Sequence, residues 1–323
     1  MPTPGPPPPG LPADWPHRAF SQTVVAGPHR WHVQVMGEGP DLLLLHGAGG
    51  AGHSFRGLAP LLSPRFRLIV PDLPGQGHTR PGRRDRFGLD AMAEDLGHLC
   101  DALGATPDAA IGHSAGAALA LRLAEVRPLR AVAGLNAALG TFDGVAGVLF
   151  PLIARALRAA PFVPQVFARL TGTTSKVAAL LSSTGSTLDA EGVELYRRLV
   201  ARPDHVEGAL AMMAAWRLEG LLGRLPQITL PVLLLAGAND RTVPPEVSAR
   251  AAGRLPQADC RSLPGLGHLT APQRAPGLRQ HRHRAQRRGF VAGHPREQRG
   301  VPGQRYHHAG QARQPVRWRG VVP

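Results

Sequence analysis

The chain has 323 residues, and its hydrophobic fraction of 43% and charged fraction of 18% are ordinary values for globular proteins. This length allows one large α/β domain or two smaller ones, and the composition excludes wholesale disorder, collagen and a membrane bundle. The net charge of +15 is concentrated at one end, because residues 269–323 hold 12 of the 37 basic residues and one of the 22 acidic ones. The first 268 residues carry only +4, so we expect no nucleic-acid partner.

The N-terminal residues 1–16 are rich in proline and lack the basic and apolar regions of a secretory signal, which predicts a disordered leader. Cys100 and Cys260 are too few for a disulfide framework and have no zinc-ligand spacing, so both are expected to be core thiols. The most apolar stretch, residues 144–168, is interrupted by three prolines and two arginines and is too broken to span a membrane. We therefore expect a cytoplasmic protein.

Short apolar runs separated by helical patterns follow the leader. The run at residues 41–46 is apolar between its ends without alternation, as in strands buried on both faces of a parallel sheet. Further strands are predicted at residues 23–26, 31–36, 68–70, 109–111, 131–135, 232–236 and 259–263. Helical patterns lie between them at residues 55–62, 89–103, 115–124 and 247–255. This alternation predicts an α/β fold with a mostly parallel central sheet and helices on both faces.

Residues 140–217 interrupt the alternation, because they contain helical stretches and no buried-strand pattern. The simplest interpretation is a helical cap inserted after the sixth strand, between core segments at residues 17–139 and 218–271. Ligands bind at the carboxyl ends of strands in open α/β sheets, so a cap at that edge would enclose the binding site.

The motif Gly112-His113-Ser114-Ala115-Gly116 lies between a predicted strand and a predicted helix. A serine on such a strained turn needs minimal side chains two positions before and after it, and Gly112 and Gly116 supply them. The turn would expose the Ser114 hydroxyl at the N-terminus of the helix, which makes Ser114 the candidate nucleophile.

A serine hydroxyl reacts only when a base removes its proton and a third group orients that base. His268 directly follows the last predicted strand, where the histidine of a Ser…Asp…His order should be found. Asp240 follows the carboxyl end of the strand at residues 232–236, and is the candidate acid. The loop after residues 131–135 is another place for an acid, but the chain has Asn136 there.

An oxyanion hole is the fourth requirement, and each backbone donor in such a site contributes about 3 to 4 kcal/mol. The sequence His46-Gly47-Ala48-Gly49-Gly50 ends the predicted strand at residues 41–46, and its glycines would let the backbone approach a substrate. The N–H groups of Ala48 and Ala115 are the expected donors. We expect His46, Gly47 and His113 to support these loops, and no metal or organic cofactor is implied.

These motifs resemble the α/β-hydrolase superfamily over about residues 20–269. The resemblance rests on His46-Gly47, residues 72–79, the Ser114 turn, Asp240 and His268, in that order. It implies an α/β-hydrolase fold and a Ser-Asp-His triad. We expect Asp72 and His78 to be structural residues of the turn at residues 72–79. Serine at position 114 argues against relatives with a carboxylate nucleophile, and leaves esterase, thioesterase, amidase and carbon–carbon bond hydrolase activities open.

A closer resemblance links the chain to the magnesium-chelatase accessory hydrolases encoded with bacteriochlorophyll-synthesis genes in photosynthetic bacteria. It is carried by residues 14–18, 30–33, 135–139, 183–189 and 212–216, some of them in the predicted cap. The resemblance implies a small-molecule substrate, for which a tetrapyrrole intermediate is one candidate, and magnesium-chelatase subunits as partners. A second hypothesis stays open, in which the chain is a non-catalytic accessory that binds a porphyrin or assists the chelatase.

The basic tail, residues 272–323, departs from the superfamily, which continues into an amphipathic helix where this chain has Arg, His, Gln, Gly and Pro without an apolar stripe. A genuine tail could bind nucleic acid, acidic lipid or an acidic partner, or a metal through His281, His283, His307 and His308. Lys176 is the only lysine beside 36 arginines, which indicates a GC-rich gene. We hypothesise a frameshift just after the His268 codon, and an unbroken frame through Pro323 on resequencing would contradict it.

Overall fold

The protein is described by a computed structural model over residues 6–140, 165, 168–169 and 172–269. Among these residues eight strands form one sheet, in the order β1-β2-β4-β3-β5-β6-β7-β8. The pairs β1–β2 and β2–β4 are antiparallel and all other pairs are parallel. The strands are β1 (Ser21–Ala26), β2 (His29–Met36), β3 (Asp41–Leu45), β4 (Arg67–Pro71), β5 (Ala109–His113), β6 (Ala131–Leu135), β7 (Val232–Gly237) and β8 (Ala258–Leu263). The predicted mostly parallel sheet is confirmed.

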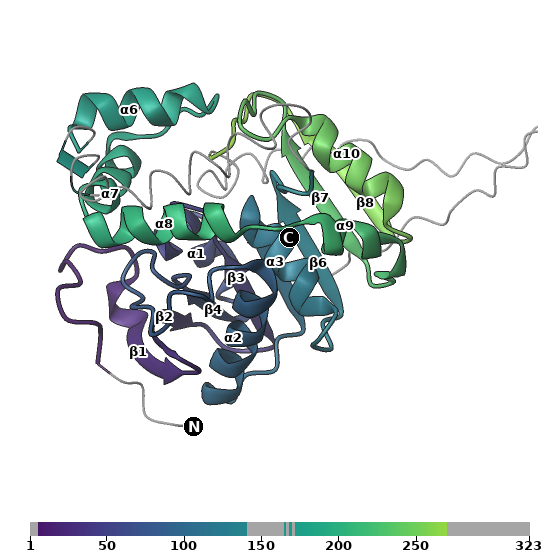
Figure 1. Cartoon of the computed structure of the whole chain (residues 1–323), viewed down its shortest axis with the longest axis horizontal. Helices are drawn as coiled ribbons and strands as arrows, with labels where there is room; N and C mark the ends of the chain where they lie inside the picture. The colour runs from purple at the N-terminus through teal and green to yellow at the C-terminus, as the bar shows by residue number, and fades with distance from the viewer. Residues whose placement is uncertain (1–5, 141–164, 166–167, 170–171, 270–323) are drawn as a thin grey trace, which may run out of the picture.

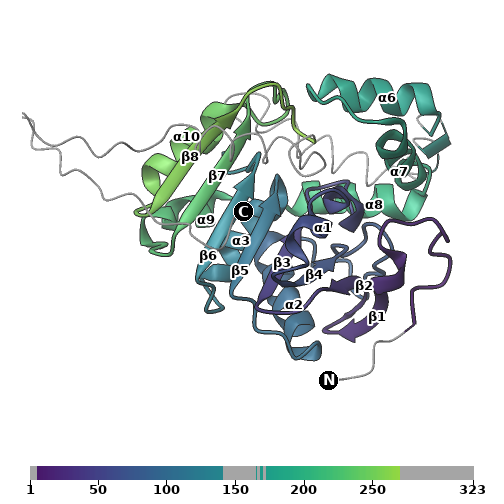
Figure 2. The ribbon, with the colours of Figure 1, turned by 180° about the vertical axis from the view of Figure 1, so that it is seen from behind.

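Helices cover both faces of the sheet, as Figures 1 and 2 show. On one face lie α2 (Leu89–Ala102), α3 (Ala115–Ala124) and α10 (Pro245–Arg254), and on the other η2 (Gly52–Phe55) and α1 (Ala59–Leu62). Within β3, Leu43 and Leu45 join the apolar cluster under α2 and α3, whereas Leu42 and Leu44 join the cluster under α1. Burial on both sides explains why this strand contains no polar residue between its ends.

The helix predicted at residues 55–62 is divided in two. A 3₁₀ turn ends at Phe55, and α1 begins separately at Ala59, with Pro60 in its first turn. Proline has no N–H to donate and is accommodated only at the start of a helix, so one continuous helix through Pro60 is unfavourable.

Between residues 172 and 217 the structure describes three helices, within the part of the chain predicted as a cap. They are α6 (Thr174–Ser183), α7 (Ala190–Val200) and α8 (Pro203–Ala215), and we call them the cap helices. Helix α7 begins where the Asp189 carboxylate accepts a hydrogen bond from the Gly192 N–H at 2.7 Å. In Figures 1 and 2 the cap helices lie together, above β2 and β4 in the view. The short helices α9 (Glu219–Arg224) and η3 (Leu225–Gln227) return the chain to the sheet.

Leu11 and Trp15 of the leader pack against cap helix α7, so the disorder expected for residues 1–16 does not extend to these two residues. Trp15 is 3% exposed and Leu11 is 6% exposed. Both belong to one apolar cluster with Ala51, Leu195 and Leu199. The two large side chains bury apolar area against α7, a contact to residues far along the chain that the local proline content does not reveal. Residues 1–5 lie outside the described residues.

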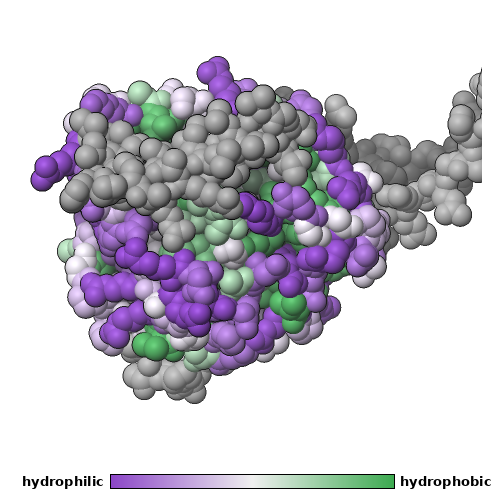
Figure 3. Space-filling model, in the orientation of Figure 1, coloured by the Kyte–Doolittle hydropathy of each residue, from purple (hydrophilic) through white to green (hydrophobic). Residues whose placement is uncertain are grey.

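The described surface is mainly hydrophilic on the face shown in Figure 3, with apolar side chains in small groups. Cys100 is buried as predicted, whereas Cys260 on β8 is only half-buried. Over the described ranges, no helix has the length and apolar character needed to cross a bilayer. The basic tail, residues 272–323, and residues 141–164 of the predicted cap lie outside these ranges.

Replacing Trp15 tests whether the leader contributes to the fold. Trp15→Ala should lower the free energy of unfolding by about 3 kcal/mol, because it opens a cavity between the leader and α7. Urea denaturation monitored by circular dichroism measures the change. Phe20→Ala removes an aromatic ring that is 47% exposed and should cost less than about 1 kcal/mol. Equal small losses in both variants would mean that the leader does not stabilise the protein.

Candidate active site

The turn between β5 and α3 holds Ser114 in a strained backbone conformation. Ser114 has φ 52° and ψ −118°, although positive φ is uncommon for residues other than glycine. Side chains are excluded on both sides of this turn. A Cβ added at Gly112 would overlap the Gly116 carbonyl, and a Cβ added at Gly116 would overlap the carbonyl of Leu45. The turn therefore forms only with glycine at both positions, where α3 packs directly on β3 and β5.

Ser114, His268 and Asp240 are joined in one line of hydrogen bonds. His268 Nε2 lies 3.1 Å from Ser114 Oγ, and His268 Nδ1 lies 2.7 Å from Asp240 Oδ2. The second carboxylate oxygen of Asp240 accepts hydrogen bonds from the N–H groups of Thr242 and Val243 at 2.8 and 2.9 Å. Because Asp240 accepts the Nδ1–H of His268, Nε2 is left as the acceptor that faces the serine hydroxyl. This is the tautomer that a general base requires.

The loop after β3 lies against the serine turn. A Cβ added at Gly47 would come 2.9 Å from the Cβ of Ser114. The Gly47 carbonyl accepts hydrogen bonds from His46 Nδ1 at 2.8 Å and from the Gly50 N–H at 3.0 Å. That carbonyl shares a planar peptide group with the Ala48 N–H, so fixing one fixes the direction of the other. Ala115 is the first residue of α3, where N–H groups have no partner within the helix.

His46 is a buried, neutral side chain that orients this peptide. Its Nε2 accepts a hydrogen bond from the Leu73 N–H at 2.8 Å, so its proton is on Nδ1, which donates to the Gly47 carbonyl. Burial lowers the pKa of His46, although the nearby negative charge of Asp72 acts to raise it. The geometry gives His46 a role in holding the loop, and leaves no ring nitrogen free to act as a base.

The sequence of the chain also matches a known protein family. Residues 40–275 match the family described as alpha/beta hydrolase fold. The chain belongs to the α/β-hydrolase family. It is 51% identical to the "Magnesium-chelatase 30 kDa subunit" of Rhodobacter capsulatus over 84% of this chain and 96% of that relative, which confirms the closer resemblance. It is 32% identical to the "Pimeloyl-[acyl-carrier protein] methyl ester esterase" of Stenotrophomonas maltophilia over 73% of this chain and 89% of the relative.

Solved structures agree on the fold. An α/β hydrolase fold protein from Burkholderia ambifaria superposes with a TM-score of 0.66 at 23% identity, covering 80% of this chain and 94% of that one. A thermophilic esterase from Thermogutta terrifontis gives a TM-score of 0.62 at 23% identity, covering 83% and 98% of the two chains. At these identities the likeness is evidence for the α/β-hydrolase fold alone.

In this α/β hydrolase, Asn136 and His113 hold the backbone of the His268 loop. The His268 carbonyl accepts from Asn136 Nδ2 at 2.7 Å and from His113 Nε2 at 2.8 Å. Asn136 Nδ2 also reaches the Gly267 carbonyl at 3.1 Å, and its Oδ1 accepts from the Gly237 N–H at 2.7 Å. Asn136 has φ 49°, a conformation that asparagine tolerates better than most residues. From the sequence, position 136 is expected only as a possible place for an acid, and no local pattern predicts this supporting role.

The turn after α6 supports the same loop from the cap. The Leu269 N–H donates to Ser186 Oγ at 2.8 Å, and the His268 N–H donates to the Thr184 carbonyl at 3.4 Å. A Cβ added at Gly267 would overlap the Gly185 carbonyl, so the two backbones are in contact. The loop that carries His268 is therefore bonded both to the sheet and to the cap.

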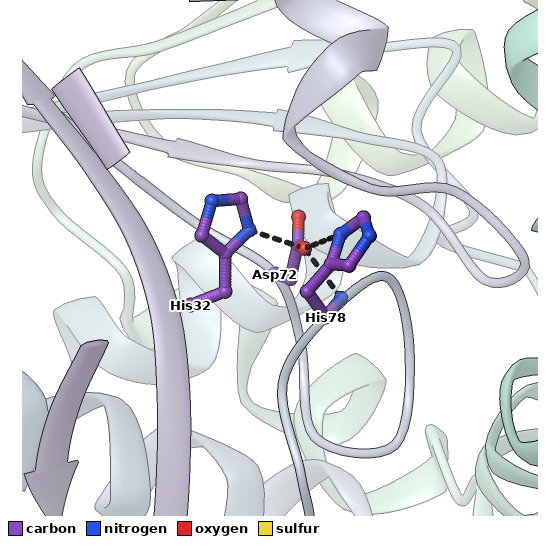
Figure 4. A group of neighbouring side chains, drawn as sticks. All are labelled: His32, Asp72 and His78. Atoms are coloured by element: carbon purple, nitrogen blue, oxygen red, sulfur yellow. Dashed lines mark hydrogen bonds and ion pairs between the residues drawn. The ribbon is translucent and has the colours of Figure 1, made fainter. Parts of the chain in front are cut away.

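One group of metal-ligating residue types occurs among the residues with described positions, and it is shown in Figure 4. It consists of His32, Asp72 and His78. Asp72 Oδ2 accepts from His32 Nδ1 at 2.7 Å and from the His78 N–H at 2.8 Å, and Oδ1 accepts from the Gly52 N–H at 2.7 Å. Despite full burial, His32 and His78 hold the pKa of Asp72 well below its usual range. These bonds tie the loop after β4 to β2 and η2, and a metal would have to displace the His32 proton.

Replacing Asn136 tests its support of the His268 loop. Asn136→Ala should lower the free energy of unfolding by about 2 to 4 kcal/mol, because the Gly237 N–H and two carbonyls lose a buried partner. Asn136→Gly loses the same hydrogen bonds without the strain of a Cβ at positive φ, and should cost about 1 kcal/mol less. Urea denaturation of both variants measures this. Wild-type stability in Asn136→Gly would show that the hydrogen bonds contribute nothing.

Acid pH should destabilise the protein through its buried histidines. Burial lowers the pKa of His53 and His113 to about 3 and that of His205 to about 4. Below about pH 6.5 these histidines become protonated in the unfolded chain but stay neutral in the folded chain. The free energy of unfolding should therefore decrease as the pH is lowered from about 6.5 to 4. Each histidine adds a slope of up to about 1.4 kcal/mol per pH unit. Urea denaturation across this range measures the slope, and His53→Gln should reduce it. A stability independent of pH in this window would refute the assignment.

Proposed function

We propose that this chain is a serine hydrolase that acts in the cytoplasm, in bacteriochlorophyll formation near the magnesium-chelatase step. The observation that carries the proposal is the line of hydrogen bonds from Asp240 through His268 to Ser114, with Ser114 held at positive φ at the start of α3. A strained residue persists only where surrounding structure enforces it, and such strain gathers at functional sites. Simple binding of a ligand has no use for an oriented serine and its base.

The first half of the reaction forms an acyl-enzyme. Ser114 Oγ attacks the carbonyl carbon of an ester-like substrate while His268 Nε2 takes the hydroxyl proton. The Asp240 carboxylate accepts the Nδ1–H and stabilises the imidazolium. The carbonyl oxygen becomes an oxyanion that accepts hydrogen bonds from the N–H groups of Ala48 and Ala115. When the intermediate collapses, His268 gives its proton to the departing alcohol, and the acyl group stays on Ser114.

The second half restores the serine. Water attacks the acyl carbon and transfers a proton to His268, which then returns a proton to Ser114 Oγ as the carboxylic acid leaves. The net reaction is an ester plus water giving an acid plus an alcohol. It needs the nucleophile Ser114, the base His268, the acid Asp240 and the oxyanion donors, and it consumes no cofactor.

Two relatives indicate the substrate class. The 32% identical relative is named as a methyl ester esterase, which supports acyl transfer from an ester-like substrate. The 51% identical relative is named as a magnesium-chelatase subunit, which supports a tetrapyrrole intermediate as the substrate and chelatase subunits as partners. Serine at position 114 supports an acyl-enzyme over the alkyl-enzyme formed by a carboxylate nucleophile.

A second candidate function is a non-catalytic accessory that binds a porphyrin or assists the chelatase. One observation favours it, since the 51% identical relative carries the name of a subunit rather than of an enzyme. The two candidates differ in what the Ser114 hydroxyl does. Only the hydrolase requires that hydroxyl to be a nucleophile.

Covalent labelling separates the two candidates. A fluorophosphonate probe should add one adduct to the wild-type protein and none to Ser114→Ala, as measured by intact-mass spectrometry. Hydrolysis of a p-nitrophenyl ester should fall at least about a thousandfold in Ser114→Ala. Ser248→Ala, which removes a buried hydroxyl on α10, is the matched control and should label like the wild type.

Failure to label folded wild-type protein would contradict the hydrolase. In that case a titration of protoporphyrin by absorbance, carried out with Ser114→Ala, tests the accessory function directly. Porphyrin binding that is unchanged in Ser114→Ala, together with unchanged chelatase activity, would support the accessory function.

A further inference from the structure

His205 of cap helix α8 is buried against the catalytic core, with 2% of its surface exposed. Its Nδ1 accepts a hydrogen bond from the Gly77 N–H at 3.0 Å. Because Nδ1 is an acceptor, the ring proton is on Nε2, which donates to the Gly49 carbonyl at 3.2 Å. Burial lowers the pKa of His205 to about 4, so the ring is neutral and keeps this pattern at neutral pH.

The hydrogen bond from His205 is the first link of a relay to the candidate oxyanion hole. The Gly49 carbonyl shares a planar peptide group with the Gly50 N–H, and that N–H donates to the Gly47 carbonyl at 3.0 Å. The Gly47 carbonyl in turn shares a peptide group with the Ala48 N–H. Two rigid peptide groups therefore connect the cap histidine to the candidate oxyanion donor. Gly49 has φ 76°, which lets the loop turn back sharply enough to close this relay.

Two more contacts join α8 to the same loops. A Cβ added at Gly208 would overlap the Gly75 carbonyl, so α8 meets the loop after β4 backbone to backbone. Gln76 of that loop accepts the Gly49 N–H on Oε1 at 2.6 Å and directs its Nε2 at Met212 Sδ, 3.1 Å away. His205, Gly208 and Met212 are spaced by three and four residues, so they lie on one face of α8. That face of the cap helix rests on the loops that carry Ala48 and Gln76.

We propose that His205 is a positioning residue, which holds the Ala48 N–H in the direction that an oxyanion requires and so couples the seating of α8 to the reactivity of Ser114. This inference rests on the proposed hydrolase function. An oxyanion donor acts only when it is aimed at the place where charge develops, and losing one donor lowers the rate about a hundredfold to a thousandfold. His205 acts through intervening peptides, so its loss costs about tenfold to a hundredfold.

Two amide variants separate the hydrogen bonds of His205. The glutamine amide nitrogen reaches the place of Nε2, so His205→Gln keeps a donor for the Gly49 carbonyl. The shorter asparagine reaches only the place of Nδ1, so His205→Asn keeps an acceptor for the Gly77 N–H and loses the contact to Gly49. Both variants lose the ring and its packing. A lower rate in His205→Asn than in His205→Gln therefore reports the loss of the hydrogen bond to the Gly49 carbonyl.

The measurement is steady-state hydrolysis of a p-nitrophenyl ester by the full chain, with fluorophosphonate labelling rates as a second readout. His205→Asn should lower kcat about tenfold to a hundredfold with KM nearly unchanged, because an oxyanion contact forms only in the transition state. His205→Gln should stay within about threefold of the wild type. His98→Asn and His98→Gln change a half-exposed histidine on α2 and should leave both rates unchanged.

A purely structural role predicts a different result. In that case His205→Asn and His205→Gln would lower the melting temperature and the rate equally, and equal rates at matched folded fraction would overturn the proposal. Amide hydrogen exchange by NMR keeps the test independent of turnover. The Gly50 N–H should exchange faster in His205→Asn than in His205→Gln, and equal protection would overturn the positioning role. An unreactive Ser114 in wild-type protein would instead refute the hydrolase function, with the exchange result still standing.

Discussion

The absence of space for a side chain at the start of α3 is the constraint on which the candidate site depends. Gly112 and Gly116 let β5, α3 and β3 approach until their backbones touch, and Gly47 lets the next loop meet Ser114. Because β3 and β5 are neighbours in the sheet, the loop after β3 is delivered to the serine turn by topology. The positive φ of Ser114 is held by this packing, and the positions of the other groups follow from it.

Each loop that approaches Ser114 is bonded on two sides. The His268 loop is held by Asn136 on the sheet side and by the turn at Thr184 on the cap side. The Ala48 loop is held by His46 on the sheet side and by His205 on the cap side. The cap helices are therefore part of the framework that holds the loops around Ser114 in place.

Sequence patterns predicted what depends on local chemistry. The unbroken leucines of β3 indicate two buried faces, and the glycines around Ser114 indicate a turn too tight for side chains. The packing of Trp15 was missed, because its partners lie on α7 and no local signal marks them. His205 was missed for the same reason, since Gly77 and Gly49 are 128 and 156 residues away in the chain. Asn136 lies in a loop that the sequence marks as a possible place for an acid. Its hydrogen bonds were missed because they join it to Gly237, Gly267 and His268, which are 101, 131 and 132 residues away in the chain.

The separation of Ser114 from His268 along the chain also orders events during synthesis. The two residues are 154 positions apart, so at about 5 to 20 residues per second the serine leaves the ribosome about 8 to 30 s before its hydrogen-bond partner. Throughout that interval the nascent chain carries a hydroxyl without a base. The site therefore cannot assemble until nearly all of the described chain has been synthesised and is available to fold.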